Sequence, residues 1–236
     1  MSVKEKMTAI ADAIREKTGG TEEMTLDAMA EAITGIEAGG GGSSGNVDEL
    51  RGVLSRTGTT FTDDTITTLG KYACAASELV SVNLPAVKIG KGYIFNACYS
   101  LETVYLPKLT STGGQAFSNC SKLKTVHMPL LSEVPLQDFA NCYAVELLDF
   151  HNLAKINGAG FQNARSLATL ILRKSSVCSL ANTNAFNGTP FASGGTGGTV
   201  YVPSALIESY KTATNWSTLY TAGTCNFVAI EGSEYE

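Results

Sequence analysis

The sequence predicts a mainly β solenoid of 22-residue units, with a helical module before it and an α/β cap after it. Phe95, Phe117, Phe139 and Phe161 recur at an interval of 22 residues, and each opens a similar phrase. Between them the pattern Leu-x-x-Val-x-Leu returns in every unit. A fixed period of this length is typical of a solenoid, because one short unit cannot bury its own apolar face and must stack on its neighbours.

The same positions stay apolar in successive units and so predict the core. The second half of the pattern alternates apolar and polar residues, which indicates a half-buried strand. A second apolar pair, such as Leu131 with Val134, predicts a short extended segment at the other edge of each unit. The core columns are Leu79, Leu101, Leu123, Val145 and Leu167; Val82, Val104, Val126, Leu148 and Leu170; and Leu84, Leu106, Met128, Phe150 and Leu172.

The cysteines follow the repeat and not a metal or disulfide pattern. Cys98, Cys120 and Cys142 share one column with Ala76 and Ala164, so the column is a slot for a small apolar residue. The other three cysteines form no Cys-x-x-Cys pair and have no cluster of histidines nearby. We expect reduced, structural thiols, no metal site and no cofactor.

Residues 1–38 predict two amphipathic helices that serve as an attachment or oligomerisation module. Ser2 to Glu5 has the form of a capping box, and Thr18-Gly19-Gly20 ends the first helix. Two short helices bury little by themselves, so their apolar faces are expected to dock on a partner or on copies of themselves. A loosely ordered leader is the alternative. The predicted docking residues are Met7, Ile10, Ile14, Leu26, Met29 and Ile33.

The rest of the chain divides by composition. Residues 39–45 form a Gly/Ser linker, natural or engineered, and residues 46–64 are expected to cap the first unit. Residues 65–185 hold the repeats and residues 186–236 the C-terminal cap, with a last strand at 199–202, a helix from Pro203 and Trp216 as an anchor.

Charge and hydropathy exclude several classes of function. The chain has 17 Lys and Arg against 22 Asp and Glu, a net charge of −5, and shows no basic stripe for nucleic acid. No apolar run is long enough to span a membrane, and the polar start lacks the apolar core of a signal peptide. We therefore expect neither nucleic-acid binding, membrane insertion nor export by the usual route.

Side chains that point outward from the predicted strands are the candidates for ligand contact. One row holds Asn83, Tyr105, His127, Asp149 and Ile171, and the next holds Glu102, Lys124 and Glu146 as a charge ladder. His127 beside Asp149 resembles two members of a catalytic triad, but no serine or cysteine nucleophile stands in position, so we expect no enzyme activity. The candidate ligand-binding residues are Tyr105, His127, Asp149, Glu102 and Lys124.

The repeats resemble the BspA-like leucine-rich repeats of bacterial surface proteins. Leu101 to Pro107 and Leu123 to Pro129 carry the first half of that unit, and Leu109 to Phe117 carries the second. His151 and Arg173 replace the proline that ends the strand in other units. The resemblance covers roughly residues 65–230, includes the closing segment Val202 to Ser217, and implies a leucine-rich-repeat solenoid that binds or adheres.

The segment Lys6 to Ile36 resembles the N-terminal module of bacteriophage tail and virion-associated proteins. That resemblance implies attachment to a phage tail or baseplate, assembly in the host cytoplasm, location in the virion, and a homotrimer as one possible state. The resulting hypothesis is a non-enzymatic tail-associated adhesion or receptor-binding protein that contacts a glycan or protein on the bacterial surface. Its alternatives are a structural virion spacer without a receptor role and a bacterial leucine-rich-repeat interaction protein.

Overall fold

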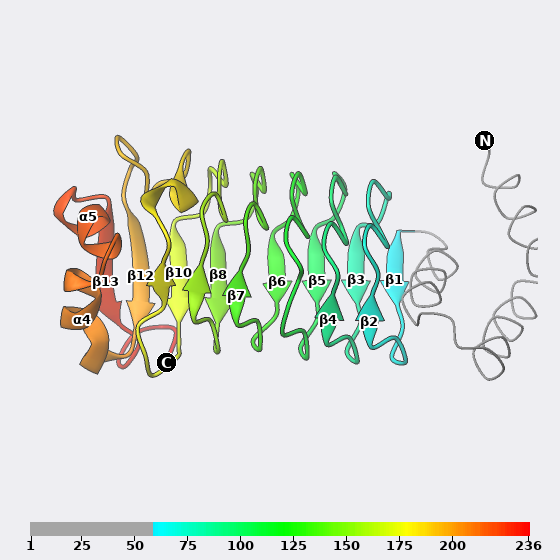
Figure 1. Cartoon of the computed structure of the whole chain (residues 1–236), viewed down its shortest axis with the longest axis horizontal. Coiled ribbons are helices and arrows are strands. Elements are labelled where there is room, and N and C mark those ends of the chain that lie inside the picture. The colour runs from blue at the N-terminus through cyan, green and yellow to red at the C-terminus, as the bar shows by residue number, and fades with distance from the viewer. Residues whose placement is uncertain (1–58) are drawn as a thin grey trace, which may run out of the picture.

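The computed structural model describes residues 59–236, which form an elongated stack of short parallel strands closed by two helices at the C-terminal end (Figure 1). The predicted mainly β solenoid is confirmed. The strands are β1 (Thr60–Thr62), β2 (Thr68–Leu69), β3 (Ser81–Asn83), β4 (Ile89–Gly90), β5 (Thr103–Tyr105), β6 (Thr125–His127), β7 (Glu133–Val134), β8 (Leu147–Phe150), β9 (Lys155–Ile156), β10 (Thr169–Leu172), β11 (Ser179–Leu180), β12 (Gly198–Val202) and β13 (Cys225–Ala229).

Five of the described units contribute one strand to each of two faces; the unit of β5 reaches the second face only through an isolated bridge at Ser111, and β12 and β13 have no counterpart there. We call the face of β1, β3, β5, β6, β8, β10, β12 and β13 the first face, and that of β2, β4, β7, β9 and β11 the second face. Pairing is parallel and steps by one unit, so that Val82 lies opposite Val104 and Val104 opposite Val126. Equivalent residues of neighbouring units therefore stand side by side along each face.

The predicted columns form one continuous core. Leu101, Leu123 and Leu167 are fully buried, as are nearly all members of the three columns. The period phenylalanines stack on one another through the middle of the molecule. Their ring centroids are 5.5 Å apart for Phe95 and Phe117, 5.2 Å for Phe117 and Phe139, and 5.7 Å for Phe139 and Phe161. Stacking of this kind stabilises neighbouring units beyond the area that they bury.

The turn around each phenylalanine places two residues in the left-handed backbone region. One of these positions holds Asn119, Asn141 and Asn163 in successive units, with φ of 66°, 61° and 59°. Asparagine tolerates this conformation better than most residues. The Asn141 amide donates to the Asn119 side-chain oxygen at 2.8 Å, and the Asn163 amide donates to that of Asn141 at 2.9 Å. The turns are thus joined by a ladder of amide hydrogen bonds.

The cysteine column is a packing slot, as predicted. All six cysteines are free and buried. In the column, the Cys120 thiol donates to the Phe95 carbonyl and the Cys142 thiol to the Phe117 carbonyl, both at 3.1 Å. Burial raises the pKa of Cys142 far above its ordinary value and that of Cys225 to about 12. These thiols therefore stay protonated and poorly reactive while the protein is folded.

The helices of residues 59–236 lie in the C-terminal part. After the 3₁₀ turn η1 (Thr183–Phe186), strand β12 leads into η2 (Ser204–Leu206), α4 (Ile207–Thr212) and α5 (Trp216–Thr221). Trp216 is fully buried, and its indole N–H donates to the Cys178 carbonyl at 2.7 Å, which agrees with the predicted anchor. A strand does end at Val202, but the expectation that it is the last strand is wrong. Strand β13 follows α5 and pairs with β12, because Phe227 belongs to a strand that closes the first face.

Several predicted parts lie outside the described residues. These are the helical module 1–38 with Met7, Ile10, Ile14, Leu26, Met29 and Ile33, the linker 39–45, and most of the cap 46–64. Within the range predicted for that cap, β1 already pairs with β3 as a regular strand of the first face. No helix of residues 59–236 is long and apolar enough to cross a membrane.

Candidate functional site

The predicted ligand-binding residues on β5 and β6 gather on the first face. Tyr105 lies opposite His127, and their rings stack with centroids 4.8 Å apart and planes within 8°. Both side chains are exposed, Tyr105 by 42%. Beside them the Lys124 ammonium lies 3.2 Å from the Glu102 carboxylate. Four of the five predicted residues therefore form one exposed patch, which we call the β5–β6 patch: Glu102, Tyr105, Lys124 and His127.

Asp149 is held apart from that patch by a different partner. The Arg173 guanidinium donates to both carboxylate oxygens of Asp149, at 2.8 Å from Nε and 2.9 Å from Nη2. His151 lies 3.8 Å from the same carboxylate. Asp149 is thus engaged with residues that follow it in the chain, and within residues 59–236 no hydrogen bond or ion pair joins it to His127.

The row of outward residues that contains Tyr105 and His127 is no longer exposed at its last predicted member. Ile171 was expected to point to solvent, but it is only 1% exposed. Its neighbour across the ladder is Tyr201, against which Tyr235 packs edge-on at 4.7 Å. The chain end therefore lies close to this part of the face, and the exposed part of the row is confined to the units before β10.

The strand ladder of the first face is interrupted between β6 and β8. Strands β1, β3, β5 and β6 form one sheet, and β8, β10, β12 and β13 form another. In the regular units, two consecutive N–H groups donate to one carbonyl of the preceding unit, as Lys124 and Thr125 do to Glu102. The corresponding bonds from Glu146 and Leu147 to the Lys124 carbonyl are not made in the described structure. Val126, alone in its column, is only partly buried at this point.

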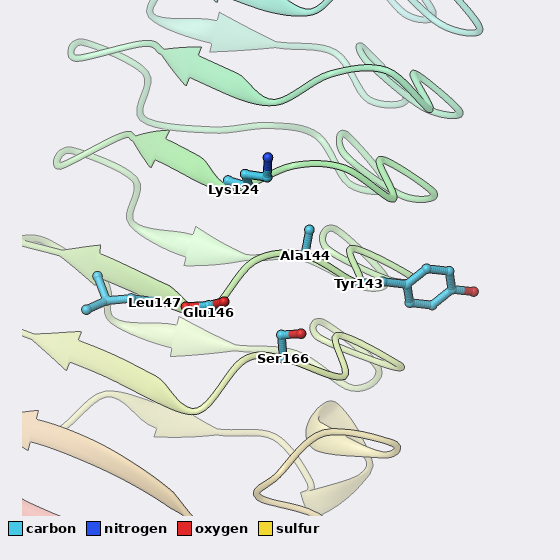
Figure 2. A pocket seen from close by; sticks show the side chains of 6 residues that line it. All are labelled: Lys124, Tyr143, Ala144, Glu146, Leu147 and Ser166. Carbon is cyan, nitrogen blue, oxygen red and sulfur yellow. The ribbon is translucent and has the colours of Figure 1, made fainter.

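A cleft of about 630 Å³ opens at the interruption. Figure 2 shows its lining residues on three successive units: Lys124 on the first, Tyr143 to Leu147 on the second and Ser166 on the third. The volume falls within the range of roughly 300 to 1,000 Å³ that is typical of small-ligand sites. We call this the β6–β8 cleft, lined by Lys124, Tyr143, Ala144, Glu146, Leu147 and Ser166.

Sequence reasoning identified Lys124 but assigned no binding role to the other lining residues. The period gives their columns, yet a column does not show where the ladder opens. The sequence did hold a signal for the cleft: the unit of Tyr143 differs in residue type from the preceding unit at several outward positions. Among the described residues, moreover, no group of three or more His, Cys, Asp or Glu side chains lies close enough to hold a metal ion.

A buried carboxyl group lies in the unit that leads into the cleft. Asp138 is fully buried and accepts hydrogen bonds of 2.8 Å from the Ala116 N–H and the Thr112 hydroxyl. Burial raises the pKa of Asp138 from 3.8 to about 7, and these two hydrogen bonds lower it in part. The corresponding residues before the other phenylalanines are apolar or glycine: Ile94, Ala116, Gly160 and Ala185.

Parallel strands that repeat every unit, a continuous apolar core and polar outward rows define the chain as a repeat-protein solenoid. Six copies of the BspA type leucine-rich repeat region match residues 65–192, more than half of the chain. The protein belongs to this family of leucine-rich-repeat proteins.

A solved structure shares the fold. It is a leucine-rich repeat protein from Bacteroides ovatus, 24% identical, with a TM-score of 0.51. The alignment covers 75% of this chain and 44% of the solved chain, so this chain spans less than half of that protein. A comparison with curated proteins gives no significant match. The comparisons support the repeat region and give no support for a module related to phage tails.

Proposed function

We propose that the protein is a non-enzymatic bacterial interaction protein that binds a partner on the surface of bacterial cells through its first face. The observation that carries this proposal is the exposed Tyr105–His127 stack beside the Glu102–Lys124 ion pair. Aromatic side chains are enriched where proteins bind one another, because they supply large contact area at a small entropic cost. An aromatic stack on the solvent side of a solenoid adds nothing to its core.

Among the described residues, the strands of the second face carry no ring stack, although Lys155 and Glu133 form an exposed ion pair there at 3.4 Å. Its outward hydroxyl groups already donate to the preceding unit: Thr110 to the Lys88 carbonyl at 3.0 Å, and Ser132 to the Thr110 carbonyl at 3.1 Å. Ser179 does the same to the Ala154 carbonyl at 3.1 Å. Groups that are satisfied within the protein have less to offer a partner. The contrast between the two faces therefore favours the first face as the binding surface.

The test is attachment of the labelled full chain to intact bacterial cells, beginning with Bacteroides ovatus. The double variant Tyr105→Ala/His127→Ala should reduce attachment by about tenfold or more, since loss of two central aromatic contacts costs at least about 1.4 kcal/mol. The matched control is Lys88→Ala/Ile89→Ala, which removes exposed side chains from the second face. Equal attachment of both variants, at the level of the wild type, would remove the first face from consideration.

A narrower form of the proposed function is that the protein is part of a phage particle. In it, residues 1–38 attach the chain to a phage tail or baseplate, in a virion assembled in the host cytoplasm, with a homotrimer as one possible state. This version is supported only by the likeness of Lys6 to Ile36, whereas the family match over residues 65–192 suits a bacterial protein equally. Light scattering on the full chain and on residues 46–236 tests the module. Identical monomer masses would count against assembly through residues 1–38, and finding the chain in purified phage particles would favour the virion.

A further inference from the structure

The unit that forms the far side of the β6–β8 cleft differs around the opening from the unit directly before it. In three outward columns it carries an apolar or aromatic residue where the preceding unit carries a polar one. The exchanges, read from the preceding unit to this one, are Ser121 to Tyr143, Lys122 to Ala144, and Thr125 to Leu147. All three of the second residues line the cleft. Where the preceding unit has the long side chain of Lys122, the cleft is lined by the methyl group of Ala144.

The rim of the cleft offers both donors and acceptors of hydrogen bonds. The Glu146 carboxylate and the Ser166 hydroxyl make no hydrogen bond to another side chain of residues 59–236. The Lys124 ammonium stands on the near side, bound to Glu102 at 3.2 Å. Because the ladder is interrupted here, the N–H groups of Glu146 and Leu147 also lack the carbonyl that their equivalents use in regular units.

The Tyr143 ring of the cleft is restrained by a neighbouring cation. The Arg165 guanidinium lies over the Tyr143 ring, 5.0 Å from its centroid. A cation in this position is attracted to the ring face and restricts the movement of the ring. Tyr143 remains 40% exposed, so an apolar surface stays available to a ligand.

We propose that the β6–β8 cleft binds a short segment of a neutral glycan. This proposal rests on the proposed function, since it names the chemistry of one contact on the first face. A sugar ring has an apolar C–H surface, which fits Tyr143, Ala144 and Leu147. Its hydroxyl groups both donate and accept, which fits a rim that offers a carboxylate, a hydroxyl, an ammonium and free N–H groups.

Other ligand chemistries fit the cleft less well. The charge of Lys124 is already paired with Glu102, which leaves Glu146 as the unpaired charge of the lining, so an anionic ligand is disfavoured. A peptide that adds a strand needs a run of free backbone groups along an edge. Strands β6 and β8 are not paired with each other, but they are only three and four residues long, so the free edge that they give a peptide is short. A neutral polyol matches both the short opening and its mixed polarity.

The test is titration calorimetry of the full chain with cellotetraose, maltotetraose and chitotetraose at millimolar concentration, with a short Thr- and Val-rich peptide as the competing class. We expect saturable binding of at least one tetrasaccharide. Tyr143→Ala and Glu146→Gln should each weaken it by about tenfold. Tyr99→Ala is the matched control, because Tyr99 occupies the same column two units earlier, is 60% exposed and lies outside the cleft.

The sharpest variant is Ala144→Lys, which restores the residue type that Lys122 gives to the same column one unit earlier. The lysine side chain should occupy the cleft and abolish glycan binding. The fold should tolerate the substitution, because Lys122 is exposed at the equivalent position. Unchanged tetrasaccharide affinity in Ala144→Lys would overturn the proposal, as would binding of the peptide and of no tetrasaccharide. Loss of glycan binding with undiminished cell attachment would confirm the cleft and leave the partner of the β5–β6 patch as a separate contact.

Discussion

Replacing Asp138 by Asn tests whether a buried carboxyl group makes the stability of the solenoid depend on pH. Asp138 is fully buried, and its two protein partners are the Ala116 N–H and the Thr112 hydroxyl. Asparagine keeps the acceptor for Ala116 and can donate its amide to Thr112, so the fold should be retained while the titrating group is removed.

The magnitude follows from the difference in pKa between the folded and unfolded chain. Burial raises the pKa of Asp138 from 3.8 to about 7, despite the opposing effect of its hydrogen bonds. Between these two pKa values the unfolded chain therefore releases this proton while the folded protein keeps it. The contribution of Asp138 is fully present below about pH 4, falls as pH rises to about 7 and is constant above that. At about 1.4 kcal/mol per pH unit, the loss amounts to roughly 4 kcal/mol.

The assay is the free energy of unfolding in urea, measured from about pH 4 to about pH 8 for the wild type and Asp138→Asn. The variant should gain stability relative to the wild type as pH rises, by roughly 4 kcal/mol over the range. Glu146→Gln serves as the control, because it removes an exposed carboxylate from the following unit. A difference between Asp138→Asn and the wild type that stays constant with pH would refute the reasoning.

Four further predictions concern the core of the stack, its turns and its C-terminal end. Asn141→Ala should lower the free energy of unfolding by about 2 kcal/mol, because it removes the hydrogen bonds to Asn119 and from Asn163; urea unfolding measures this. Asn141→Gly should cost less than Asn141→Ala, since glycine accepts the left-handed φ of 61° without strain, and a larger loss with glycine would contradict this account. Trp216→Phe should cost about 1 to 3 kcal/mol, because it leaves the buried Cys178 carbonyl without its indole donor; a melting temperature equal to that of the wild type would count against the anchor. The six buried thiols should react with a thiol reagent only after unfolding, as counted by mass spectrometry, and rapid labelling of the native protein would disprove their burial.

The sequence was sufficient to predict what the period itself determines. The Phe95 to Phe161 interval located the stacked rings, and the alanines that share the cysteine column identified that column as a packing slot. These features repeat because every unit must pack on the next in the same way. A repeated constraint leaves a repeated pattern, which can be read from one chain.

The features that depend on a single unit were not predictable in the same way. Arg173 reaches back 24 residues to Asp149, and its long side chain gives no sign of that direction in the sequence. The interruption between β6 and β8 depends on backbone geometry, and the columns stay apolar across it. Asp138 did carry a signal, as an acid among apolar residues and glycine, and the Ser121-to-Tyr143 exchange carried another. Both signals are found by comparing the residues at equivalent positions of the units and noting where one unit differs from the others.

The binding account is tested most directly by hydroxyl-radical footprinting of the full chain attached to intact bacterial cells. Four exposed tyrosines report on different parts of the molecule: Tyr105 on the β5–β6 patch, Tyr143 at the cleft, Tyr72 near the first units and Tyr220 on α5. We predict that attachment protects Tyr105 and Tyr143 from oxidation and leaves Tyr72 and Tyr220 unchanged. Protection of Tyr72 or Tyr220, with Tyr105 and Tyr143 oxidised as in the free protein, would contradict it.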